Sequence, residues 1–237
     1  MSASAAALLM SAVAAAASLV SLAYALYFRR SERTATVSSR GAAYHFLLEV
    51  SSAKQWAVFL HDDDTFDRLH AALRATTEDV ADVVGTPAGK VRANMFARDP
   101  DHKLRIPPGL TYNMDRREEL DIAIELGQGS TGRAYALGIT NVAIRVPGET
   151  LQQEWGPDLI GDPAEQRKVH PDLSWIISVP LTLPGIPPLL IFNVDGIEEA
   201  DTDRIERATY IVQTWSQMML YLILDRAAAG RFTHAAH

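Results

Sequence analysis

The sequence contains no cysteine among its 237 residues. Disulfides, thiolate metal sites, thiol nucleophiles and cysteine-linked chromophores are therefore excluded. Basic residues are also in the minority, with 22 Lys and Arg against 29 Asp and Glu. Nucleic-acid binding needs clustered positive charge to neutralise phosphates, so no nucleic-acid partner is expected.

The sequence also lacks a recognisable set of metal ligands. Its histidines are scattered, and no H-E-x-x-H or similar spacing occurs. The sequence therefore predicts no metal site.

Residues 5–28 contain neither a charged residue nor a proline. As a helix they would be about 36 Å long, which exceeds the roughly 30 Å hydrocarbon core of a bilayer. Arg29, Arg30 and Arg33 follow at once, and the positive-inside rule places that side in the cytoplasm. We predict a single-pass transmembrane helix over residues 5–28 in the cell membrane, with the C-terminal domain cytoplasmic.

A cleaved signal peptide is the alternative interpretation of this segment. Residues 23–25 (Ala-Tyr-Ala) resemble a cleavage site, but no basic residue precedes the apolar run. The anchor is therefore preferred, although retention of the segment stays open.

The remaining pattern predicts a mixture of helices and short strands. Residues 29–64 are interpreted as a juxtamembrane linker and helix, residues 65–229 as one domain and residues 230–237 as a tail. Apolar residues at three- and four-residue spacing predict helices over residues 66–84 and 203–229, with Gly85 and Gly230 ending them. Residues 175–183 and 189–194 form a predicted hairpin. This order indicates an α+β fold with a mostly antiparallel sheet.

Strands are further predicted at residues 91–96, 103–106, 110–114, 121–126 and 141–146, and short helices at residues 131–137 and after Asp162. The predicted strand at residues 121–126 leads into Gly127, Gly129 and Gly132, which make a G-x-G-x-x-G pattern. That pattern binds dinucleotide phosphates when it opens a parallel βαβ unit with an acidic residue about 20 residues further on. Glu149 lies at about that distance, but it sits in a turn, and no further βαβ units follow. The glycines are therefore interpreted as a tight strand-to-helix turn, and no cofactor is predicted.

The motif at residues 124–135 resembles the strand–glycine loop–helix element of GAF domains. The Ser-x-Pro-Leu strand at residues 175–181 and its partner at residues 192–195 resemble the hairpin of the same family, and residues 92–96 fit its first strand. The resemblance covers about residues 66–224. It implies a six-stranded antiparallel sheet flanked by N- and C-terminal helices, which often form a dimer bundle, and loops around a small-molecule pocket on the other face.

From this resemblance we expect a membrane-anchored sensory or regulatory domain that binds a small ligand or recruits a partner. No catalytic activity is expected, because family members that reduce methionine sulfoxide use cysteine. The resemblance also implies homodimerisation through the terminal helices, and a protein partner would carry any signal onward. Two alternatives are a pocketless dimerisation scaffold and an NAD(P)- or flavin-dependent enzyme that uses the Gly127-Gly129-Gly132 loop.

Five polar or aromatic residues could line the implied pocket. Each has a structural alternative: a tryptophan at position 175 is typical of an ordinary core, and one at position 155 of a pinned loop. Trp215 and the pair Met218–Met219 are expected at a helix–helix contact. The candidate ligand pocket consists of Asn94, Tyr112, Arg145, Trp155 and Trp175.

Overall fold

The computed structural model describes residues 41–45, 47–48, 50, 52–61, 64–145, 160–183 and 186–234. The elements below belong to one compact unit, Tyr44–His237. In chain order they are α2 (Ala53–His61), α3 (Thr65–Val84), η1 (Ala88–Lys90), β1 (Val91–Arg98), β2 (Lys103–Arg105), β3 (Thr111–Tyr112), α4 (Arg117–Leu120), β4 (Ile124–Glu125), α5 (Gly129–Leu137), β5 (Asn141–Ile144), α7 (Pro163–Gln166), β6 (Trp175–Leu181), β7 (Leu190–Gly196) and α8 (Thr202–His234).

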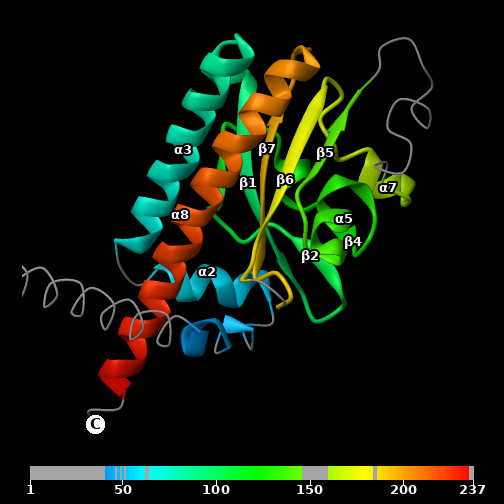
Figure 1. Cartoon of the computed structure of the whole chain (residues 1–237). Coiled ribbons are helices and arrows are strands. Elements are labelled where there is room, and N and C mark those ends of the chain that lie inside the picture. The colour runs from blue at the N-terminus through cyan, green and yellow to red at the C-terminus, as the bar shows by residue number, and fades with distance from the viewer. Residues whose placement is uncertain are drawn as a thin grey trace, which may run out of the picture. The chain divides into compact units, whose positions relative to one another are not determined.

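The centre of the domain is a sheet in which every described strand pair is antiparallel (Figure 1). The strand order is β4-β2-β1-β7-β6-β5, and β3 pairs separately with β1. The longest pairings are β1 with β7, from Val91↔Gly196 to Ala97↔Leu190, and β6 with β7. The described part therefore confirms the α+β class. It differs from the expected six strands because two-residue β3 and β4 bring the sheet to seven.

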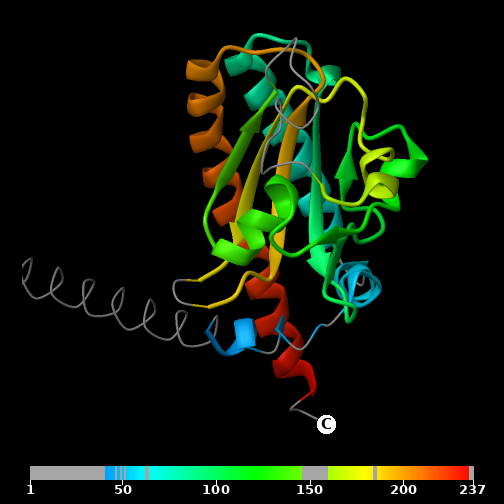
Figure 2. The ribbon, with the colours of Figure 1, turned by 90° about the vertical axis from the view of Figure 1, so that its right-hand side faces the viewer.

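Two long helices cover one face of the sheet, as Figure 2 shows from the side. α3 lies beside α8, and its buried face includes Leu69, Leu73 and Val80 at the predicted helical spacing. Gly85 ends α3 in the left-handed conformation, with φ 77°, and its N–H donates to Ala81 O. α8 continues past Gly230 to His234, so the predicted stop at Gly230 is wrong.

The helix–helix contact expected from Trp215 and the methionine pair is made within the chain. Trp215 Nε1 donates to Asp79 Oδ2 of α3 at 2.9 Å. Met219 is fully buried, whereas Met218 is half exposed. Only one of the two methionines therefore packs in the contact, because consecutive residues of a helix point in different directions.

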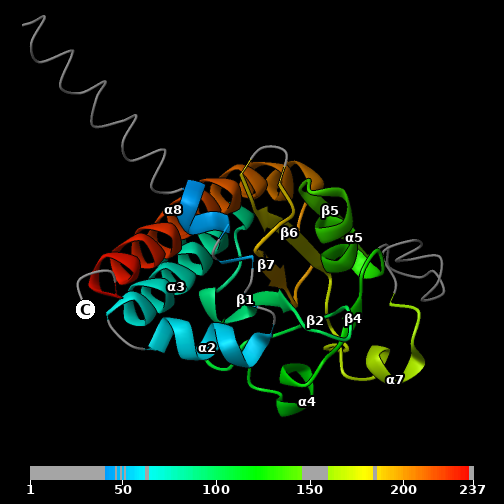
Figure 3. The ribbon, with the colours of Figure 1, turned by 90° about the horizontal axis from the view of Figure 1, so that it is seen from below.

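The opposite face carries the short helices α4, α5 and α7, which Figure 3 shows across the sheet from α3 and α8. β1 is consequently buried along almost its whole length, from Val91 to Ala97. A strand covered on both faces does not alternate between buried and exposed residues.

The glycine loop joins antiparallel β4 to α5. Gly127 and Gly129 have φ of 84° and 61°, and α5 begins at Gly129, earlier than predicted. At Gly132 a Cβ would lie 2.4 Å from the carbonyl oxygen of Glu125. Because β4 pairs antiparallel with β2, the loop does not open a parallel βαβ unit, and the dinucleotide interpretation loses its structural basis.

The predicted transmembrane helix over residues 5–28 lies outside the described residues. Among the helices that the structure does describe, none is both long and apolar enough to cross a membrane. The anchor stays a prediction from the sequence.

Candidate functional site

A cavity of about 340 Å³ lies on the face of the sheet opposite α3 and α8. Strands β1, β6 and β7 supply its floor, and α4, α5 and residues 160–173 supply its walls. Its volume is at the lower end of the range for small-molecule sites. It is lined by Arg92, Asn94, Phe96, Ile106, Met114, Glu119, Ile122, Ile124, Gly129, Ser130, Thr131, Arg145, Ile160, Gln166, Arg167, Val169, His170, Pro171, Leu173, Ile176, Asn193 and Asp195.

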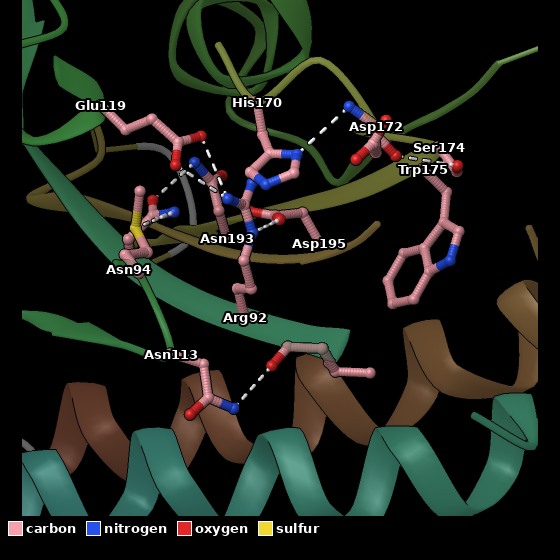
Figure 4. Close-up of polar contacts among 12 residues, drawn as sticks. Arg92, Asn94, Asn113, Glu119, His170, Asp172, Ser174, Trp175, Asn193 and Asp195 are labelled. Atoms are coloured by element: carbon pink, nitrogen blue, oxygen red, sulfur yellow. Dashed lines mark hydrogen bonds and ion pairs between the residues drawn. The ribbon is translucent and has the colours of Figure 1, made fainter. Parts of the chain in front are cut away.

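Three charged side chains from different elements meet in the cavity lining. Arg92 of β1 donates from Nε to Asp195 Oδ1 at 2.6 Å, and from Nη1 to both carboxylate oxygens of Glu119 at 2.9 and 3.1 Å. Figure 4 shows the guanidinium between the two carboxylates. All three side chains are no more than 5% exposed. This charged cluster (Arg92, Glu119 and Asp195) therefore holds two acids against one base away from water.

The burial of the charged cluster shifts its protonation equilibria. Loss of water raises the pKa of Glu119 and of Asp195 above the ordinary values, and the attraction of Arg92 offsets only part of this effect. Burial alone would lower the pKa of Arg92, but the two acids outweigh it and the pKa is raised. The guanidinium therefore stays charged, while the carboxyls are more readily protonated than exposed ones.

Polar side chains continue from the charged cluster along the floor. Asn193 Nδ2 donates to Asn94 Oδ1 at 3.1 Å and to Thr131 Oγ1 at 3.0 Å. Asn193 Oδ1 is buried and has no hydrogen-bond partner among the described residues. Buried polar atoms are nearly always paired, so an unpaired acceptor in a cavity lining indicates a place for a donor from outside the chain.

The segment 160–173 is tied to the rest of the wall by specific hydrogen bonds. Glu165 Oε2 accepts from Ala123 N at 2.7 Å, and Arg116 Nη1 donates to Val169 O at 3.1 Å. Asp162 caps α7 by accepting from Ala164 N at 2.7 Å, which confirms the predicted start of that helix. These contacts hold Val169 and His170 in the cavity lining.

Four of the five predicted pocket residues lie in the part of the chain that the structure describes, and two of these four line the cavity. Asn94 and Arg145 line the cavity. Tyr112 instead packs edge-on against His70, with 5.8 Å between the ring centroids. Trp175 is fully buried, and its Nε1 donates to Glu198 O at 3.1 Å. Trp155 lies outside the described residues. Ligand contact by any of the five stays a prediction.

Sequence reasoning missed the charged cluster and Asn193. A signal was present, because Arg92 stands within the predicted strand at residues 91–96 and Asp195 directly follows the predicted strand at residues 189–194. A charged residue is seldom buried unless it is paired, so one base and one acid at two such strands indicate partners. Glu119 carried no such signal, since α4 is a single turn within a polar segment.

This arrangement, a curled antiparallel sheet with two long helices on one face and a cavity under short helices on the other, is a GAF-like domain, and the resemblance predicted from the sequence is confirmed for the domain. The membrane-anchored part of that prediction is not covered by this result.

Known structures with this architecture share little sequence with the chain. The GAF domain of a phosphoenolpyruvate-protein phosphotransferase from Coxiella burnetii is 12% identical with a TM-score of 0.45, over 70% of this chain and 98% of that one. Free methionine-R-sulfoxide reductase from Neisseria meningitidis, in complex with its substrate, is 18% identical with a TM-score of 0.44, over 71% and 95%. The type II free methionine-R-sulfoxide reductase from Thermoplasma acidophilum is 14% identical with a TM-score of 0.43, over 68% and 95%. No protein-family model and no curated protein matches the chain.

The expectation that the domain has no catalytic activity, which was based on the absence of cysteine, is wrong. The similar structures from Neisseria meningitidis and Thermoplasma acidophilum are free methionine-R-sulfoxide reductases, which are enzymes. A fold positions side chains around a cavity, and the side chains rather than the fold decide between binding and chemistry. An enzymatic role is therefore compatible with the architecture.

Proposed function

We propose that the cavity on the open face of the sheet is a binding site for a small ligand, and that the domain senses or acts on that ligand. The observation that supports this is the cavity lining itself. It combines a buried charged cluster, an unpaired acceptor on Asn193 and an apolar wall. A small number of precisely positioned polar groups in a mainly apolar cavity is typical of small-molecule sites.

A cavity-filling substitution tests this proposal. Ile176 lies in the cavity lining and is only partly buried, so Ile176→Trp is expected to fill the space without a large loss of stability. Ile139→Trp makes the same change at a side chain that is 60% exposed and outside the lining. Thermal-shift screening with metabolite classes should give hits for the parent and for Ile139→Trp, and these should be lost in Ile176→Trp.

Two results would count against a binding site here. One is a parent protein whose melting temperature no metabolite class raises, which favours the pocketless scaffold. The other is hits that persist in Ile176→Trp.

Each hit is then incubated with the parent and followed by mass spectrometry, so that conversion of the ligand, and with it an enzymatic role, is detected directly.

Anchoring in the membrane is a second part of the proposal and is supported by the sequence alone. We expect residues 5–28 to hold the protein in the membrane with its domain in the cytoplasm. A reporter that is active only in the periplasm, fused after His237, should be silent, and one active only in the cytoplasm should work. The opposite result, or release of the protein into a soluble fraction after cleavage, contradicts the anchor.

Pairing of two copies through the terminal helices also stays a proposal. It is supported by apolar side chains that α8 leaves exposed, namely Tyr210, Met218 and Tyr221 at 72%, 49% and 42%. Sedimentation velocity over a concentration series distinguishes a monomer from a dimer.

A further inference from the structure

The charge balance of the cavity indicates which ligand it suits. In the charged cluster, two carboxylates share one guanidinium, and all three side chains are nearly inaccessible to solvent. With both acids ionised, the floor therefore carries one more negative than positive charge. A buried excess of charge is unfavourable, and a positive group from a ligand would compensate it.

Hydrogen bonding points to the same kind of ligand group. Asn193 Oδ1, which can only accept, is buried and unpaired among the described residues. Asn193 and Asp195 both line the cavity. A protonated amine has three N–H donors and no acceptor, so it can serve Asn193 and a carboxylate together. A carboxylate or phosphate group of a ligand would instead meet more acceptors.

The other cationic residues of the cavity lie nearer the solvent. Arg167 is exposed, and Arg145 is half-buried with Nη1 donating to Pro171 O at 3.3 Å. His170 lies over the charged cluster in Figure 4, is half-buried, and accepts at Nδ1 from Asp172 N at 3.1 Å. The excess of acid is therefore at the buried end of the cavity.

An apolar wall stands beside the charged end. Its buried members pack as one cluster. They come from β1, from the chain that runs from the end of β2 into β4, and from the start of the segment 160–173. A ligand that is polar throughout would leave this wall without apolar contacts, so the ligand should also have an apolar body. The wall residues that line the cavity are Phe96, Ile106, Ile122, Ile124 and Ile160.

We propose that this cavity recognises a small organic cation. Its protonated amine would lie against Asp195, Glu119 and Asn193 Oδ1, and its apolar body against the apolar wall. The inference rests on the proposed function, since it names the ligand class of the same site.

Three probes of similar shape and different charge test it by calorimetry: 2-phenylethylammonium, the neutral 2-phenylethanol and the anionic 3-phenylpropanoate. The amine should bind about tenfold more tightly than the alcohol, which is what one hydrogen bond to a charged group contributes. The anion should bind more weakly than either. Equal binding of amine and alcohol, or tighter binding of the anion, overturns the inference.

Two variants locate the effect. Asp195→Asn leaves one acid for one base, so the amine should lose its preference over the alcohol while the alcohol still binds. Asp82→Asn removes the same charge from the exposed surface of α3 and should leave the preference unchanged. If Asp195→Asn does not fold, Glu119→Gln makes the same test. A preference that survives in the cavity variants contradicts the assignment.

The experiments distinguish a failure of the cation preference from a failure of the binding site itself. If the three probes do not bind but the metabolite screen gives hits that Ile176→Trp abolishes, the cation preference is wrong and the binding site stands. If neither the probes nor the screen gives cavity-dependent binding, the binding site itself is wrong.

Discussion

Replacing Arg92 with alanine should lower the free energy of unfolding by about 3–5 kcal/mol, the usual cost of removing one partner from a buried ion pair. Glu119 and Asp195 would be left facing each other with their side chains no more than 5% exposed. Urea denaturation at neutral pH measures the change. Arg74→Ala is the matched control, because its pair with Glu78 spans 3.7 Å on the surface and should contribute less than about 1 kcal/mol.

The pH dependence of this loss has a definite sign. The pKa values of Glu119 and Asp195 are raised in the folded protein, so the folded state holds protons more tightly than the unfolded chain. Their contribution to stability is therefore greatest below the ordinary carboxyl pKa and falls as the pH rises through the raised values. Without Arg92 this fall should be steeper, and Arg92→Ala should recover part of its stability in acid. A loss that is independent of pH would contradict a buried charged cluster.

Gly132→Ala should destabilise the domain by about 1–3 kcal/mol, as expected when an extra methyl is forced into a packed site. The new Cβ would lie 2.4 Å from the carbonyl oxygen of Glu125 and 3.2 Å from the amide nitrogen of Gly127, both of which are backbone atoms that cannot rotate away. Thermal and urea unfolding measure the effect. Gly89→Ala is the control, because nothing lies within 4 Å of its added Cβ.

This substitution also separates the two interpretations of the glycine loop. A structural turn predicts that Gly132→Ala lowers stability whether or not a nucleotide is present. A dinucleotide site predicts instead that the parent binds NAD or NADP in calorimetry and that the substitution abolishes the binding. Tight nucleotide binding by the parent, with a fully stable Gly132→Ala, would contradict the structural role.

The elements with long, regular patterns were predictable, and the site was not. The helix over residues 66–84 follows from apolar spacing and Gly85, which act locally, and the hairpin of β6 and β7 follows from two apolar runs around a proline-rich turn. The charged cluster joins Arg92, Glu119 and Asp195, which are far apart in the sequence and meet only through the sheet. Local sequence propensity carries no information about contacts between residues that are far apart in the sequence. The sequence pattern could have identified Arg92 and Asp195 as buried charges, but not which acid on α4 would complete the cluster.

The pairing of β1 with β7 has a consequence for how the chain reaches its native state. These are the first and last strands of the sheet, and they form its middle. Closing a loop that contains all the other strands of the sheet costs entropy before any contact repays it, and folds rich in such distant contacts fold slowly. During synthesis the edge of β1 that pairs with β7 stays without its partner until β7 has left the ribosome. We therefore expect the domain to fold after translation rather than during it, and to depend on chaperones in that interval.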